Sequence, residues 1–350
     1  MNISKTEKDD ISCGLLSCSA CRADFPIENH IPRFVPAANY SGNFGFQWNR
    51  FRQTQLDSHT GLPISRARFL AESGWNPQEL KGSLVLDAGC GSGRFAEVAL
   101  DCGATVVAVD YSSAVEACYE NLRSRPNFHI VQGDLRCLPF ARESFDYLYS
   151  LGVLQHTPDP HISFAGLPQY VKPGGSLAVD IYRLSWKCLF MPKYWLRPIT
   201  RRLSPRSLFR LTEALVPILL PISRLVARVP VIGDRLRYLI PVSNYEGRLP
   251  LNERQLRDWA LLDTFDMLSP AFDRPRTAAT LREWFEDAGL QNVEVETSYL
   301  AVARGQKPAQ LDRATTVTAS TQTRGGLGTF PNTPPNPATK SAAFLARESH

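Results

Sequence analysis

Three glycines alternate along one short stretch of the chain: Gly89, Gly91 and Gly93. Asp87 stands just before them, at the end of an apolar run. Glycines at this spacing bend the backbone sharply and let a ligand approach the main chain closely. A dinucleotide site needs a third small residue where this chain has Arg94, and the Asp87 carboxylate disfavours a phosphate nearby. We therefore expect a nucleoside ligand without a pyrophosphate, rather than NAD or FAD.

Two further acids stand where a nucleoside would need them. Asp110 closes the run "TVVAVD", about 20 residues after the first glycine, where a carboxylate can accept hydrogen bonds from both ribose hydroxyls. Asp134 in "VQGDL" follows the next apolar run and is placed to accept from an exocyclic amine such as that of adenine. The two acids together predict an adenosyl ligand.

The best candidate for proton removal is His156 in "LQHTPDP", because an imidazole has a pKa near ~6.5 and accepts a proton at neutral pH. The alternative is a histidine that only shapes the pocket wall. Asp180 and Tyr182 end another apolar run, at the sheet edge where ligands bind in such folds. Either could contact a second substrate, although a structural role at a strand end suits each somewhat better.

A third acidic group lies far along the chain, in "LLDTFDMLSPAFDRPRT". This pattern predicts a loop that returns over the site, or a solvated loop with two buried aromatic rings, which we favour slightly. The residues concerned are Asp263, Phe265, Asp266, Phe272 and Asp273.

The elements that must position these residues lie between 81 and 182. Short apolar runs alternate there with helical stretches, which predicts an α/β fold with a mostly parallel, doubly wound sheet. Before them, Phe44, Trp48 and Phe51 recur at the period of one helix face, which usually marks a buried face. After them, "TLREWFEDAGL" predicts a helix that ends at Gly289.

Residues 82–182 resemble a class I S-adenosylmethionine-dependent methyltransferase, through "LDAGCGSG", "GDLRCLPF", "FDYLYSLGVLQHTPDP" and "YVKPGGSLAVDIY" in that order. The resemblance implies a seven-stranded Rossmann-like sheet that closes with an antiparallel strand pair before Gly305. It implies S-adenosylmethionine as the cofactor, with Gln47 and Trp48 as candidate lid residues. The cofactor-binding residues that it implies are Asp87, Gly89, Gly91, Gly93, Asp110, Asp134, Leu135 and Ser150.

The beginning of the chain carries Cys18 and Cys21 as a C-x-x-C pair, with Cys13 five residues upstream. "CSACRADFPIENHIPRFV" resembles the second half of small zinc ribbons that precede some bacterial methyltransferase domains. Tetrahedral zinc requires four ligands, and the fourth here would be His30 or absent. We expect either a structural zinc at these cysteines or, in preference, a ribbon that has lost its metal.

The net charge of +5 conceals a strongly basic segment. Residues 183–240 hold twelve Lys or Arg and two acids, so the rest of the chain carries a net −5. Its aliphatic residues predict one or two helices broken at Pro217 and Pro221. We expect a cap that closes the acceptor pocket while its arginines stay in water. The alternative is that residues 203–240 contact an anionic membrane peripherally. Both the cap and the membrane contact can hold if the acceptor is lipid-like.

Composition limits the remaining classes. A chain of 350 residues, 43% hydrophobic, can bury a sizeable core. We predict a cytoplasmic protein, because the chain starts with polar residues, has no apolar run near ~20 residues and has mostly unpaired cysteines. If the insertion binds lipid, we expect the protein to be peripheral to the inner face of the membrane. Basic residues interleaved with aliphatic rather than aromatic ones argue against nucleic acid as a partner.

These observations predict methyl transfer to a small-molecule or lipid-like acceptor; the alternative is a protein that binds S-adenosylmethionine without catalysis. We divide the chain into a cysteine-bearing, zinc-ribbon-like appendage, a cofactor-binding core with a helical cover, a basic apolar helical insertion, the end of the core and a disordered tail. The appendage is 1–40, the core with its cover is 41–182, and the insertion is 183–250. The end of the core is 251–305, and the tail is 306–350.

Overall fold

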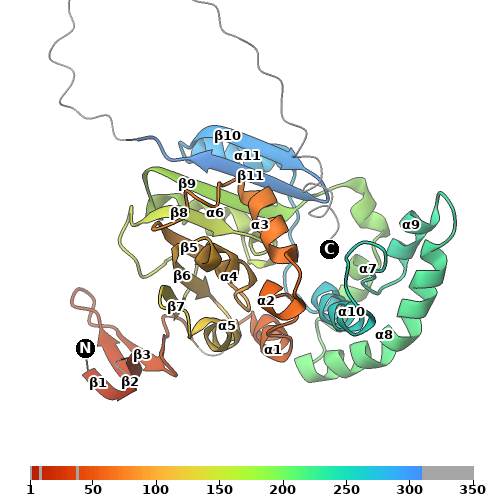
Figure 1. Ribbon diagram of the computed structural model, residues 1–350, viewed down its shortest axis with the longest axis horizontal. Coiled ribbons are helices and arrows are strands. Elements are labelled where there is room, and N and C mark those ends of the chain that lie inside the picture. Colours follow the sequence, from red (N-terminus) through yellow and green to blue (C-terminus); the bar gives the residue numbers. More distant parts are fainter. Residues whose placement is uncertain (1, 8–9, 37–38, 310–350) are drawn as a thin grey trace, which may run out of the picture.

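The computed structural model describes residues 2–7, 10–36 and 39–309. Its centre is a seven-stranded sheet with the strand order β10-β11-β9-β8-β5-β6-β7 (Figure 1). The strands are β5 (Leu84–Ala88), β6 (Thr105–Asp110), β7 (Phe128–Gln132), β8 (Phe145–Ser150), β9 (Val171–Tyr182), β10 (Gln291–Thr297) and β11 (Leu300–Gln306). The first five are parallel, and β11 runs antiparallel to both β9 and β10. The predicted doubly wound, mostly parallel Rossmann-like sheet is confirmed.

Helices cover both faces of this sheet. One face packs against α3 (Ile64–Ser73), α4 (Arg94–Asp101) and α5 (Ala114–Leu122). The other packs against α6 (Pro160–Ala165) and α11 (Ala278–Asp287), which bury Phe164, Trp284 and Phe285. Further elements are α1 (Gly42–Arg50), α2 (Asp57–Thr60), η1 (Leu154–His156), η2 (Pro168–Tyr170) and α10 (Glu253–Leu268). From β5 the chain adds β6 and β7 on one side and then β8 and β9 on the other, so the strand order reverses next to β5. In open α/β sheets, ligands bind at such a reversal, beyond the carboxyl ends of the strands.

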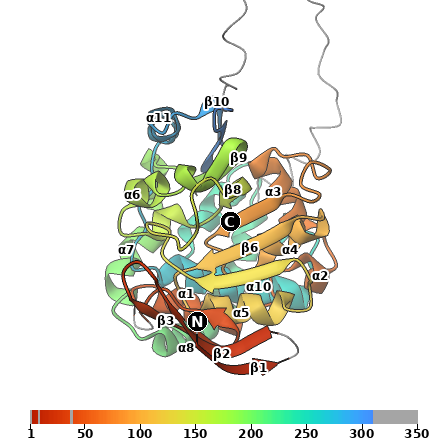
Figure 2. The ribbon, with the colours of Figure 1, turned by 90° about the vertical axis from the view of Figure 1, so that its left-hand side faces the viewer.

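Residues 1–40, the expected cysteine-bearing appendage, form a small antiparallel sheet where the structure describes them. Its strands are β1 (Asn2–Glu7), β2 (Asp10–Ser17), β3 (Asp24–Glu28) and β4 (Ile31–Pro32). Figure 2 shows this sheet beside α5, at the β7 edge of the main sheet. Arg33 anchors it there, because its guanidinium donates to Gln132 of β7 at 3.0 Å and pairs with Glu116 of α5.

The insertion consists of η3 (Trp186–Phe190), α7 (Pro192–Thr200), α8 (Pro205–Ala227), α9 (Gly233–Leu236) and η4 (Arg237–Leu239). The predicted break at Pro217 and Pro221 is wrong, since α8 runs through both prolines for 23 residues. Both rings lie on the exposed side of the helix, where water can satisfy the carbonyl groups that lose their partner. The opposite side of α8 packs against α10 and thereby joins the insertion to the core.

The end of the core extends slightly beyond the expected boundary at 305. β11 ends at Gln306, and the main chain of Lys307 still exchanges hydrogen bonds with Gly174 and Gly175. Most of the tail expected to be disordered, 310–350, lies outside the described residues. No helix in the described ranges is both long enough and apolar enough to cross a bilayer.

Candidate functional site

The glycine turn links β5 to α4 and forms the floor of a cavity at the carboxyl edge of the sheet. Gly89 and Gly91 line the cavity with φ angles of 103° and 52°. A Cβ atom on Gly91 would lie 3.1 Å from the indole of Trp48, which belongs to α1. The turn therefore needs glycine both for its backbone conformation and for the approach of α1 above it.

Asp110 closes β6 and is tied to the same turn. Its Oδ2 accepts a hydrogen bond from the Gly91 amide at 2.9 Å, and its Oδ1 accepts from the amide and hydroxyl of Ser112 at 2.8 and 2.7 Å. A carboxylate offers about four acceptor positions, so one remains for a ligand. A second becomes free when the Ser112 hydroxyl rotates, which suits a pair of ribose hydroxyls.

Asp134 lies after β7 on the cavity wall, beside Leu135. Arg136 binds the Asp134 carboxylate through Nε and Nη2, at 3.0 and 2.6 Å. Burial acts to raise the pKa of Asp134, but the hydrogen bonds from Arg136 outweigh it and lower that pKa below its ordinary value. The carboxylate is therefore ionised at neutral pH and retains its capacity to accept from an amine.

Three of the predicted cofactor residues do not line the cavity: Asp87, Gly93 and Ser150. Asp87 lies under the turn beside Tyr149, 2% exposed, and burial raises its pKa to about 8. Gly93 caps the start of α4, and the Ser150 hydroxyl donates to the Ala88 carbonyl. These positions support the turn from beneath, so Asp87 does not stand where a phosphate would lie.

The cavity has a volume of about 1100 Å³, including space open to solvent. One half is lined by the turn and the two nucleoside acids, and the other by side chains from α1, α3, β9 and α10. The lining of the second half includes Phe44, Gln47, Arg68, His156, Tyr182, Asp263 and Asp266. The residues at the turn therefore fit an adenosyl ligand, and the second half leaves room for a second molecule beside it.

His156 stands in the second half of the cavity, 7% exposed. Its Nδ1 lies 3.0 Å from the Phe272 carbonyl, which can only accept, so Nδ1 carries the proton and Nε2 keeps its lone pair. Burial lowers the pKa of His156, while Asp266 and Asp273 act in the opposite direction. The imidazole is therefore neutral at physiological pH and can accept a proton at Nε2.

Asp263 and Asp266 reach the cavity from a helix, so the loop that we predicted for this part of the chain is wrong up to residue 268, where α10 ends. Gln47 donates to Asp266 at 3.1 Å, and the Tyr245 hydroxyl donates to Asp263. Burial raises the pKa of Asp263 to about 7. Tyr182 lines the cavity, which agrees with one of its predicted roles.

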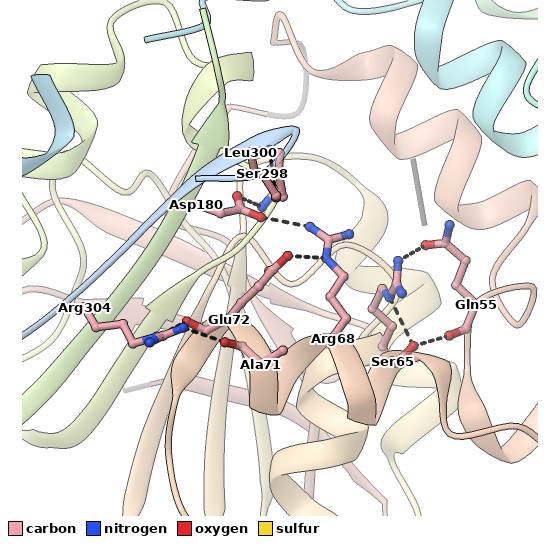
Figure 3. A network of polar contacts seen from close by, with 11 residues as sticks. Gln55, Ser65, Arg68, Ala71, Glu72, Asp180, Ser298, Leu300 and Arg304 are labelled. Atoms are coloured by element: carbon pink, nitrogen blue, oxygen red, sulfur yellow. Dashed lines mark hydrogen bonds and ion pairs between the residues drawn. The ribbon is translucent and has the colours of Figure 1, made fainter. Parts of the chain in front are cut away.

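Arg68 is a cavity residue that the sequence did not single out (Figure 3). Its guanidinium lies between two buried carboxylates, donating to Glu72 at 2.9 Å and to Asp180 at 2.8 Å. Asp180 also accepts from the Gly152 amide. Asp180 is completely buried and does not line the cavity, so its role is to tie α3 to β9 and to the loop after β8.

Arg94, expected only as an obstacle to dinucleotides, occupies the first turn of α4 and lines the cavity. It donates to Gln55 at 2.6 Å and to Ser65 at 3.1 Å. Burial lowers its pKa to about 10, which still leaves it charged, and its buried Nη2 has no hydrogen-bond partner. An N–H group without a partner beside a cavity is a donor available to a ligand.

The structure does not support the zinc site, which was the less favoured of the two expectations for the cysteines. Across the residues whose positions the structure describes, no three His, Cys, Asp or Glu side chains gather closely enough to hold a metal ion. Cys13 lies within β2, and about 16 Å of extended strand separates it from Cys18 at the hairpin. His30 instead stacks on Tyr119 of α5, with ring centroids 5.4 Å apart.

The insertion does not close the cavity directly, contrary to the cap that we expected. None of its described residues lines the cavity; α10 and α1 do so, and α8 packs behind them. The apolar face of α8 is used to hold those two helices in place. This separates the insertion's outer surface from the chemistry of the cavity.

Comparison with known proteins bears on the core of the chain. The family described as "Methyltransferase domain" matches residues 86–179. A demethylmenaquinone methyltransferase of Renibacterium salmoninarum is 36% identical over 98 residues, which are 28% of this chain and 40% of that protein. A ubiquinone biosynthesis O-methyltransferase of Coxiella burnetii is 33% identical over 110 residues, which are 31% of this chain and 47% of that protein. The matches thus span less than half the length of these two relatives.

Among solved structures, a SAM-dependent methyltransferase of Methanosarcina mazei is similar with a TM-score of 0.40 and 17% identity, covering 66% of this chain and 94% of that one.

Proposed function

We propose that this chain, which contains a class I methyltransferase domain, transfers the methyl group of S-adenosylmethionine to a small-molecule acceptor. One observation carries the proposal: a single cavity brings the glycine turn, both nucleoside acids and His156 together. The first three suit the cofactor, and His156 stands in the half that is left for the acceptor.

The bound cofactor supplies a methyl group on a positively charged sulfur, which is already activated toward a nucleophile. Gly89, Gly91, Asp110 and Asp134 hold and orient it, and α1 covers it from water. An acceptor hydroxyl would be the nucleophile that receives this methyl group. His156 Nε2 takes the hydroxyl proton.

Incubation of the purified chain with methyl-labelled S-adenosylmethionine and an organic extract of cells tests the proposal. We expect label to enter the organic phase, and demethylmenaquinone, named in one relative, is a first single acceptor to try. Tight binding of S-adenosylhomocysteine with no transfer into any extract fraction would instead support a binding protein. Boiled protein is the control.

We further propose that the acceptor is lipid-like and that residues 203–240 contact an anionic membrane. Sixteen of the seventeen large apolar side chains that are exposed in the described ranges lie between Leu184 and Leu239. On α8 they form a second apolar stripe, opposite the buried one: Leu211, Ile218, Ile222 and Leu225. The net charge of +10 over 183–240 complements anionic headgroups.

A matched pair of substitutions tests the membrane contact. Ile218→Ser removes an exposed side chain of the α8 stripe, and Ile162→Ser removes a similarly exposed one from α6, outside the insertion. We expect co-sedimentation with phosphatidylglycerol vesicles at low salt to weaken about three- to tenfold for the first and to stay unchanged for the second. Absence of vesicle binding, or a dimer that Ile218→Ser dissociates, would contradict the proposal.

A further inference from the structure

An irregular segment, residues 269–277, joins α10 to α11 and runs along η1, the short helix that carries His156. Two main-chain contacts hold it there. The Phe272 carbonyl lies 3.0 Å from Nδ1 of His156, and the Arg274 amide donates to the Gln155 carbonyl at 2.8 Å. The position of this segment therefore decides what His156 finds at Nδ1.

The residue between these two contacts, Asp273, binds α7 of the insertion through its side chain. Its Oδ2 accepts from the Arg197 guanidinium and lies 3.2 Å from Nζ of Lys193. All three side chains are largely buried, and that of Asp273 is only 4% exposed. Burial acts to raise the pKa of Asp273, but the two cations outweigh it and lower that pKa below its ordinary value. The carboxylate is therefore charged at neutral pH.

Helix α7 is itself fixed to the end of α10. Arg197 Nε donates to the Met267 carbonyl at 2.7 Å, and the Thr200 hydroxyl donates to the Leu268 carbonyl at 2.8 Å. Both carbonyls belong to the last turn of α10, where carbonyl groups lack a partner within the helix. Figure 1 shows α7 beside α10, on the side of the molecule away from the N-terminal sheet. The cations that hold Asp273 thus come from an anchored helix.

One planar peptide unit links the Phe272 carbonyl to Asp273, so holding Asp273 in place restricts the rotation of that carbonyl. In a neutral histidine, the hydrogen bond made by one ring nitrogen decides which nitrogen carries the proton. We propose that Asp273 is a positioning residue that keeps the Phe272 carbonyl on Nδ1 of His156. The proton then stays on Nδ1, and the lone pair stays on Nε2.

The proposal gives the insertion a part in the chemistry of the cavity although it does not line it. Through Arg197 and Lys193, α7 fixes the tautomer and the orientation of His156. The importance of that tautomer rests on the proposed function, in which His156 accepts the acceptor's proton. The tautomer itself can be measured without any acceptor, so the two ideas are tested separately.

Nuclear magnetic resonance of the full chain with ¹⁵N-labelled histidine tests the positioning role. The chain has six histidines, and the signals of His156 are those missing from the spectrum of His156→Asn. We expect the unmodified chain to carry the His156 proton on Nδ1 at neutral pH. In Asp273→Ala we expect a mixture of the two tautomers. Asp273→Asn keeps an oxygen that Arg197 can bind and should show a smaller change in the same direction.

Thr200→Val is the matched control. It removes a hydrogen bond between the same two helices, α7 and α10, at a buried position, but leaves Asp273 and its two cations in place. Its His156 tautomer should be unchanged. The proposal is overturned if the proton stays wholly on Nδ1 in every Asp273 variant that folds, if the unmodified chain carries it on Nε2, or if Thr200→Val shifts it as much as Asp273→Ala.

Activity separates this proposal from the proposed function. On an acceptor that must lose a proton, Asp273→Ala should lower kcat about 10- to 100-fold and leave the affinity for S-adenosylhomocysteine unchanged. A tautomer that shifts while kcat stays the same would support the positioning role and refute His156 as the base. A lowered kcat with an unshifted tautomer would refute the positioning role alone.

Discussion

Gly89→Ala is expected to reduce the affinity for S-adenosylhomocysteine at least about 100-fold. The added Cβ would lie 2.3 and 2.6 Å from the two γ-carbons of Val153, where ordinary contacts begin near 3.4 Å, and φ is already 103°. The turn or the Val153 loop must therefore move by about 1 Å, in the floor of the cavity. Calorimetric titration of the folded variant measures the loss.

Two further variants separate the clash from general strain. Gly61→Ala introduces a side chain at a similar φ of 73°, but nothing lies within 4 Å of its Cβ and the residue is outside the cavity. Its affinity should stay within about twofold of the unmodified chain. Adding Val153→Ala to Gly89→Ala removes the γ-carbons and should restore part of the affinity. Normal binding by a folded Gly89→Ala chain would refute the role assigned to this turn.

His156→Asn is expected to lower kcat about 100- to 10,000-fold on an acceptor that must lose a proton, with unchanged affinity for S-adenosylhomocysteine. The asparagine amide can replace Nδ1 as the donor to the Phe272 carbonyl, so the loop stays anchored while the Nε2 lone pair is lost. Single-turnover methyl transfer from the labelled cofactor gives the rate. A kcat within a few-fold of the original would assign His156 to the pocket wall instead.

The pH profile gives an independent test of the same residue. Burial lowers the pKa of His156, so the neutral base persists below pH ~6.5 and is protonated only in more acidic solution. The rate of the unmodified chain should be flat through neutral pH and fall on the acid side, and His156→Asn should lack that fall. His161→Asn, at an exposed position of α6, is the control and should keep both rate and profile.

The sheet could be predicted because its signals are local. Each strand is a short apolar run, and the glycine turn and Asp110 follow such runs directly. The second half of the cavity could not be predicted from the sequence, because its residues come together only when segments that are distant in the chain pack against each other. Arg68 of α3 reaches Asp180, 112 positions away, and Asp266 of α10 meets Gln47 of α1.

The errors have the same origin. Pro217 and Pro221 read as helix breaks in isolation, but both face solvent on a helix whose opposite side packs against α10. The cysteine spacing left a zinc site open as one of two expectations, whereas the strand pairing that separates Cys13 from Cys18 depends on β3. The local structure at these positions depends on how deeply the residues are buried and on which element they pack against, rather than on residue type and spacing.

Helix α1 touches both halves of the cavity at once. Trp48 covers Gly91 in the cofactor half, while Phe44 lies against His156, ring centroids 5.0 Å apart, in the other. A ligand that fixes α1 from one half lowers the entropic cost of fixing it for the ligand in the other half. Under the proposed function, cofactor and acceptor should therefore bind with positive cooperativity, and each should raise the affinity for the other through α1 rather than through direct contact.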